Sequence, residues 1–147
     1  MGRESFSSTS DRRKTDLIGI VIVAHGGLAA EYLSAMEHVV GKQDGVRAIA
    51  IAPEDDRSAK QGEICGAADG VDAGHGVVIV TDMFGGSPSN LSLQACNHEN
   101  RRILYGANLP MLVKLAKSRR RSVIDAVNAA LEAGRKYIDS HSIDLDT

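Results

Sequence analysis

The sequence is poor in aromatic residues and carries little net charge. Only 3% of its 147 residues are aromatic, none is tryptophan, and the formal net charge is -2 at pH 7. Proteins that bind nucleic acid use clustered positive charge to hold phosphates, and many also stack bases on aromatic side chains. We therefore expect no nucleic-acid partner.

Long apolar runs and paired cysteines are also missing. The longest apolar run, residues 17–24, is far shorter than the roughly 20 residues that span a bilayer, and no apolar signal segment opens the chain. The two cysteines, Cys65 and Cys96, lack C-x-x-C spacing, and we expect both to be reduced. No H-E-x-x-H or paired-cysteine motif is present, so we expect no metal site and no cofactor. These absences favour a cytoplasmic protein.

The sequence does contain enough apolar residues to form the core of one domain. Hydrophobic residues make up 43% of the chain. Residues 1–16 are serine-rich and charged, which predicts a disordered tail. The domain is expected to cover residues 17–140, followed by a flexible tail over residues 141–147. The three arginines at 119–121 are predicted to form a solvated turn, with docking to an acidic partner as the alternative.

Short apolar runs alternate with helical patterns through this domain. Such alternation is typical of βα units, and almost wholly apolar runs are typical of parallel strands covered on both faces. The predicted strands span residues 17–23, 46–51, 76–81 and 102–105. Apolar spacing and capping residues predict helices over residues 28–40, 54–68, 109–117 and 122–138, and a further helix beginning near Ser87. We therefore expect an α/β fold, a three-layer sandwich with helices on both faces of a mostly parallel sheet.

The order of the strands decides which loops share an edge of the sheet. With the order 2-1-3-4, the first and third strands are neighbours, and a ligand crevice opens at their carboxyl ends. This assumed order brings A-H-G-G (24–27) beside D-M-F-G-G-S-P-S-N (82–90). Glycine permits close backbone approach, and helix N-termini attract anions, so the glycines of these loops are predicted to bind phosphate. They are Gly26, Gly27, Gly85 and Gly86.

These two loops also hold three side chains suited to phosphoryl chemistry. We expect His25 and Asp82, which follow the first and third strands, to form a catalytic pair. A carboxylate bonded to one imidazole nitrogen fixes the tautomer, leaves the other nitrogen as a nucleophile, and stabilises positive charge on the ring during attack. Ser87 can donate its hydroxyl and N–H groups to phosphoryl oxygens. The alternative is a small-anion site in which His25 never becomes covalently modified.

Three segments resemble a known family. They are I-V-I-V-A-H-G (20–26), V-T-D-M-F-G-G-S-P-S-N (80–90) and Y-G-A-N-L-P-M-L (105–112). Over residues 17–138 the chain resembles the IIA domain of the mannose-type family of the bacterial phosphoenolpyruvate-dependent sugar phosphotransferase system. The resemblance implies that His25 accepts a phosphoryl group from the phosphohistidine of HPr and passes it to a IIB partner. It also implies that Asp82 orients His25.

The resemblance further implies a homodimer, often with an exchanged C-terminal strand. The segment after Tyr137 is polar and short, so we do not expect that exchange here. Many relatives read D-L-F-G-G-S-P-F-N where this chain has Met83 and Ser89, which leaves the reacting groups intact. We expect the IIB acceptor to be a separate protein, and any membrane association to be indirect, through a IIC/IID permease. Two alternatives stay open: a regulatory phosphohistidine switch that binds other proteins, and a phosphoryl donor to a dihydroxyacetone kinase.

Overall fold

A four-stranded parallel sheet forms the centre of the protein. The computed structural model describes residues 17–83, 87, 90–92 and 99–144. The strand order is β2-β1-β3-β4, and every pairing is parallel. This confirms the predicted α/β fold and strand order. The strands are β1 (Gly19–His25), β2 (Val46–Ile51), β3 (Val77–Thr81) and β4 (Arg101–Leu104).

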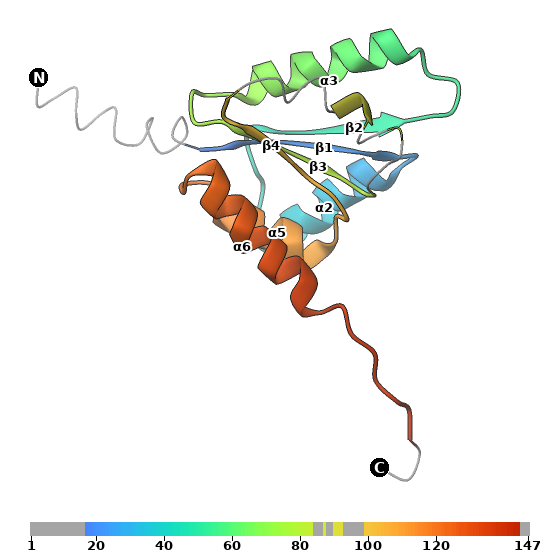
Figure 1. Ribbon diagram of the computed structural model, residues 1–147, viewed down its shortest axis with the longest axis vertical. Helices are drawn as coiled ribbons and strands as arrows, with labels where there is room; N and C mark the ends of the chain where they lie inside the picture. The colour runs from blue at the N-terminus through green and yellow to red at the C-terminus, as the bar shows by residue number, and fades with distance from the viewer. Residues whose placement is uncertain (1–16, 84–86, 88–89, 93–98, 145–147) are drawn as a thin grey trace, which may run out of the picture.

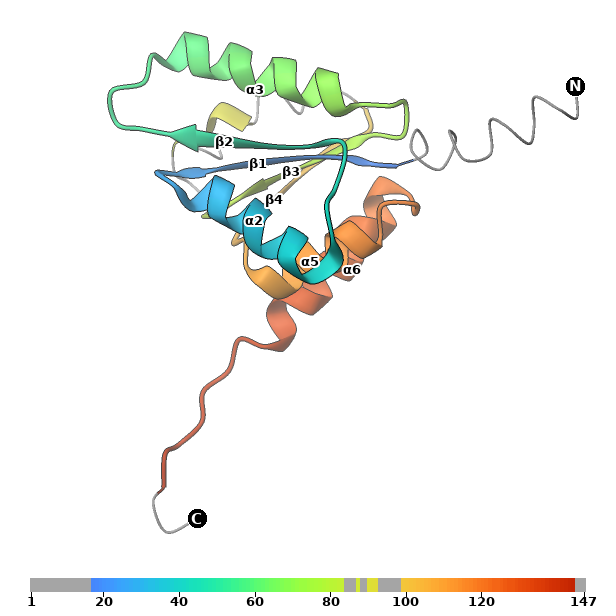
Figure 2. The ribbon, with the colours of Figure 1, turned by 180° about the vertical axis from the view of Figure 1, so that it is seen from behind.

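Helices cover both faces of this sheet, as predicted. Figure 1 shows α3 on one face and α2, α5 and α6 on the other, and the reverse view in Figure 2 shows the same layers. The helices are α2 (Leu28–Val40), α3 (Arg57–Val71), α5 (Leu109–Lys117) and α6 (Val123–Lys136). Ser87 and residues 90–92 are also helical, in agreement with the helix predicted from Ser87. The other residues of that segment lie outside the described ones.

Two apolar clusters hold the layers together, one on each face of the sheet. Along β1, Ile20 and Ile22 belong to the cluster under α2, α5 and α6, whereas Val21 and Val23 belong to the cluster under α3. All four side chains are fully buried. Because side chains alternate between the faces of a strand, an almost wholly apolar strand can supply both clusters. The central strand β1 is thereby fixed, and its carboxyl end can present a side chain at a defined position.

Capping side chains set where the helices begin. Ser122 accepts a hydrogen bond from the N–H of Asp125 at 3.2 Å, which confirms the predicted start of α6. The predicted start of α3 at residue 54 is wrong, because Asp56 is the cap and accepts a hydrogen bond from the N–H of Ala59 at 3.1 Å. A carboxylate at this position satisfies an otherwise unpaired helical N–H. The helix therefore begins at Arg57.

The prediction that residues 119–121 form a solvated turn is wrong for Arg119, which is buried. Its side chain is only 3% exposed, although the two arginines that follow it are exposed. Its guanidinium donates to the carbonyl oxygens of Ile18 at 2.8 Å and Gly45 at 3.3 Å, and to Oε1 of Gln43 at 3.1 Å. Burial lowers the pKa of Arg119, while the charge of nearby Asp44 opposes that change. The first arginine of the run is thus a structural link between the start of β1 and the segment before β2.

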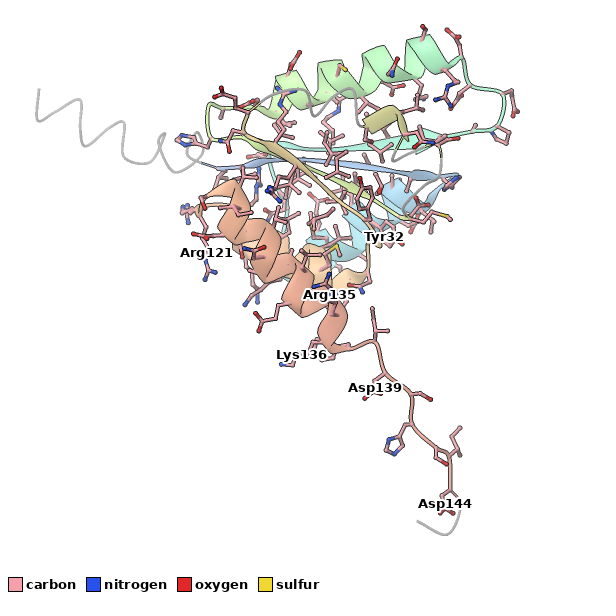
Figure 3. The ribbon with its side chains drawn as sticks, in the orientation of Figure 1. Tyr32, Arg121, Arg135, Lys136, Asp139 and Asp144 are labelled. Atoms are coloured by element: carbon pink, nitrogen blue, oxygen red, sulfur yellow. The ribbon has the colours of Figure 1, made fainter. Side chains whose placement is uncertain are left out.

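The C-terminal segment leaves the helical layer without packing on it. Helix α6 ends at Lys136, two residues before its predicted end, and residues 138–144 are exposed and form no regular structure (Figure 3). The tail expected at residues 1–16 lies outside the described residues, as do the last three residues of the tail expected at 141–147. Within the part of the chain that the structure describes, no helix is both long and apolar enough to cross a membrane.

Candidate functional site

His25 and Asp82 form a hydrogen-bonded pair at the carboxyl end of the sheet. His25 is the last residue of β1, and the register pairs Val23 of β1 with Thr81 of β3, so Asp82 follows directly beside it. The ring Nδ1 lies 2.8 Å from Oδ2 of Asp82, and the backbone N–H of His25 donates to the same oxygen at 3.1 Å. The structure therefore brings together the two side chains that the sequence predicts as a pair.

This geometry leaves one ring nitrogen of His25 available for chemistry. With the proton on Nδ1 held by the carboxylate, the lone pair lies on Nε2. The His25 side chain is 46% exposed and that of Asp82 is 9% exposed, so solvent and ligands can reach the imidazole ring while the carboxylate beside it is largely buried. Among the residues that the structure describes, no hydrogen-bond partner occupies Nε2. The arrangement is that of an activated nucleophile with a buried orienting acid.

The environment of Asp82 favours its ionised form. Burial raises the pKa of this carboxyl, but two hydrogen bonds from His25 and the charge of the ring outweigh that effect. The pKa of Asp82 therefore lies below its ordinary value of 3.8. A group with a lowered pKa in the folded state stabilises the fold above its unfolded pKa and loses that contribution as the pH falls through the folded value.

We expect the stability contributed by Asp82 to disappear on acidification. Urea unfolding of the wild type and of Asp82→Asn, compared between about pH 5 and pH 3, checks this. The wild type should lose free energy of unfolding relative to the variant as the pH falls, since asparagine does not titrate. A difference that stays constant over this range contradicts the lowered pKa.

A pocket of about 450 Å³ opens at the His25 ring. Gly26 and Ser87, both predicted as phosphate ligands, line it together with His25. The φ angle of Gly26 is +56°, in the left-handed region that favours glycine, and this turns the chain sharply after β1. Gly27 is the N-cap of α2 and supplies no capping side chain, so the first N–H groups of this helix have no side-chain partner there. Gly85 and Gly86 lie outside the described residues.

Sequence reasoning missed two cations in this pocket. Arg57 and Lys60, in the first turn of α3, line it beside His25. The available signal was topological: β2 pairs with β1 up to His25 and Ile51, so the loop after β2 must reach the same edge of the sheet. The misplaced helix start concealed the positions of these two side chains.

Tyr32, on α2, is another residue whose role was not apparent from the sequence. Its hydroxyl donates to the carbonyl oxygen of Ala107 at 3.2 Å and so joins α2 to the loop after β4 (Figure 3). Burial and, to a smaller extent, the negative charge of Asp82 raise the pKa of Tyr32. Tyr32 thus supports the loops around the pair and stays protonated at neutral pH.

Within the described residues no group of three or more His, Cys, Asp or Glu side chains is placed to hold a metal.

Comparison with known proteins shows the family to which the chain belongs. The family model EIIA-man, described as the PTS system fructose IIA component, matches residues 19–132. The chain is 30% identical over 124 residues to the PTS system mannose-specific EIIAB component of Escherichia coli K12. That match covers 82% of this chain and 38% of the relative, so the chain spans about two fifths of the length of this relative.

Solved structures agree with that assignment. The PTS IIA protein associated with the fucose utilization operon from Streptococcus pneumoniae is 28% identical with a TM-score of 0.70, covering 79% of this chain and 90% of that one. The mannose/sorbose specific IIA subunit from Enterococcus faecalis shares the fold at a TM-score of 0.76 and 22% identity, covering 87% of this chain and 97% of that one. The chain therefore belongs to the mannose-type IIA family of the sugar phosphotransferase system.

Proposed function

We propose that this protein is a phosphocarrier that accepts a phosphoryl group on Nε2 of His25 from phospho-HPr and passes it to a IIB component. The single observation that carries the proposal is the 2.8 Å contact between Nδ1 of His25 and Oδ2 of Asp82. It supports a nucleophilic Nε2 at the mouth of a pocket, in a chain that belongs to a phosphotransferase family. We further propose that the protein works in the cytoplasm as a homodimer.

The proposed transfer is a substitution at phosphorus. The lone pair on Nε2 of His25 forms the new N–P bond, the N–P bond of the donor phosphohistidine breaks, and its electron pair returns to the donor nitrogen. The His25 ring gains positive charge and keeps its proton on Nδ1. Asp82 stabilises that charge because its carboxylate is already in place before the reaction begins. Transfer to the acceptor reverses these steps at His25.

We also propose that the surrounding loops bind the phosphoryl oxygens. Ser87 would donate its hydroxyl, and the backbone at Gly26, Gly27, Gly85 and Gly86 would approach closely enough to donate N–H groups. The support for Gly26 and Ser87 is that both line the pocket with His25.

Phosphoryl labelling tests the proposed function. With labelled phosphoenolpyruvate, enzyme I and HPr, the wild type should acquire one acid-labile phosphate per chain, because the His25 ring is exposed and its Nδ1 is held by an orienting acid. The His25→Ala variant should acquire none.

His38→Ala is a matched control for this experiment, since His38 is exposed on the last turn of α2 and lies outside the pocket. It should label like the wild type. Label that persists in His25→Ala, or a wild type that takes up no label, rejects the proposal.

A further inference from the structure

We propose that Arg57 binds the phosphoryl group carried by His25 and stabilises its dianionic form. This inference rests on the proposed function, and adds a ligand that neither the family motifs nor the sequence identified. It assigns to the pocket a cationic side chain in addition to Gly26 and Ser87.

The topology of the sheet places Arg57 in the same pocket as His25. His25 ends β1, where the register pairs it with Ile51, the last residue of β2. The chain then passes through a short loop and enters α3, whose first residue is Arg57. Arg57 and His25 thus line one pocket from two neighbouring strand ends. The side chain is exposed in the free protein, so a ligand can reach it.

Of the two described cations that line the pocket, Lys60 has carboxylate partners and Arg57 has none. The ammonium of Lys60 lies 2.8 Å from Oε1 of Glu63 and 3.6 Å from Oδ2 of Asp55, so two carboxylates offset its charge. In the described part of the chain, Arg57 takes part in no ion pair. A phosphoryl group on His25 would bring about two negative charges next to the carboxylates of Asp82 and Asp55. A guanidinium can offset them and can donate two parallel N–H bonds to phosphoryl oxygens.

The position of Arg57 in its helix argues against a purely structural role. The first turn of a helix carries partial positive charge, which disfavours a cation there. The first turn of α3 contains no acidic residue, and the capping carboxylate of Asp56 is bonded to the N–H of Ala59. No contact among the described residues compensates the charge of Arg57. A bound dianion would supply that compensation.

Phosphorus NMR of the phosphorylated protein tests this proposal. Wild type and Arg57→Gln are phosphorylated on His25 with phosphoramidate, a small donor that needs no protein partner, and the phosphoryl signal is followed against pH. The second pKa of the phosphoryl group should be higher in Arg57→Gln by about 0.5 unit or more, since an adjacent cation favours the dianion. Loss of the cation should also weaken the hold of His25 on the phosphoryl group. At a pH where the dianion dominates, the transfer equilibrium of Arg57→Gln should therefore shift toward phospho-HPr by about threefold or more.

Two further variants and a stability measurement make the result specific. Arg57→Lys keeps the charge and should restore most of the lowered phosphoryl pKa. Arg120→Gln removes an exposed arginine next to Arg119, at the opposite end of the sheet from His25, and should match the wild type. The Tm of Arg57→Gln should be equal to or slightly above that of the wild type, because the cation opposes the helix dipole.

The outcomes separate this inference from the proposed function. A phosphoryl pKa in Arg57→Gln equal to that of the wild type overturns the role of Arg57, even though label on His25 would still support the phosphocarrier. A Tm several degrees lower in Arg57→Gln also overturns it, because Arg57 would then be structural. Failure of wild-type His25 to accept a phosphoryl group from phospho-HPr rejects the proposed function itself.

Discussion

Asparagine in place of Asp82 is expected to slow phosphoryl transfer to His25 by about 10²- to 10³-fold, the usual effect of removing one preorganised electrostatic group. The structure indicates which property of the carboxylate is lost. Both donors of His25, the ring Nδ1 and the backbone N–H, meet the single oxygen Oδ2. An asparagine can present its carbonyl oxygen to both donors and so preserve the tautomer. The loss therefore reports the negative charge that stabilises the developing imidazolium.

Rapid-quench measurement of phosphoryl transfer from phospho-HPr checks this prediction, and the maximal rate should fall while the donor concentration at half-maximal rate changes little. Asp56→Asn is a matched control, because asparagine caps a helix about as well as aspartate and Asp56 does not line the pocket. That control should transfer at nearly the wild-type rate. A rate for Asp82→Asn within about tenfold of the wild type would show that the charge of Asp82 contributes little to the barrier.

The pairing of His25 with Asp82 could be predicted because the positions of both residues depend on long-range features that the sequence records clearly. The apolar strands identify a parallel sheet, and once strand order is assumed, His25 and Asp82 must share an edge. The cationic side of the pocket could not be predicted in the same way. The helix predicted over residues 54–68 contained Arg57 but began before the observed cap, so the first turn of α3 was placed at the wrong residues. Local propensity did not show that Asp56 caps this helix.

Arg119 illustrates a different limit of sequence reasoning. Three consecutive arginines are typical of a solvated segment, since burying one charge is costly without partners. Two of the three partners of Arg119 are the backbone carbonyls of Ile18 and Gly45, which are 101 and 74 positions away in the chain. Every residue has a backbone carbonyl, so no sequence pattern predicts which carbonyls will meet a buried guanidinium. Arg119 and these carbonyls meet in the folded chain, where the turn after α5 bonds to Ile18 just before β1.

Methionine in place of Arg119 is expected to lower the free energy of unfolding by about 1 to 3 kcal/mol, because the carbonyl of the buried residue Ile18 would lose its guanidinium donor, and a buried group left unpaired costs about that much. Methionine keeps much of the length of the side chain, so the loss reports hydrogen bonds rather than a cavity. The carbonyl of Ile18 would lose the guanidinium, whereas the exposed residue Gly45 would keep the hydrogen bond from the N–H of Ile20 to its carbonyl. The backbone bond from Ile18 N–H to the carbonyl of residue 119 would also remain. Urea unfolding measures the change, with Arg120→Met as the control at an exposed neighbour, expected within about 0.5 kcal/mol of the wild type. A loss below about 1 kcal/mol for Arg119→Met would mean that water replaces the guanidinium and that this link is not a principal support of the start of β1.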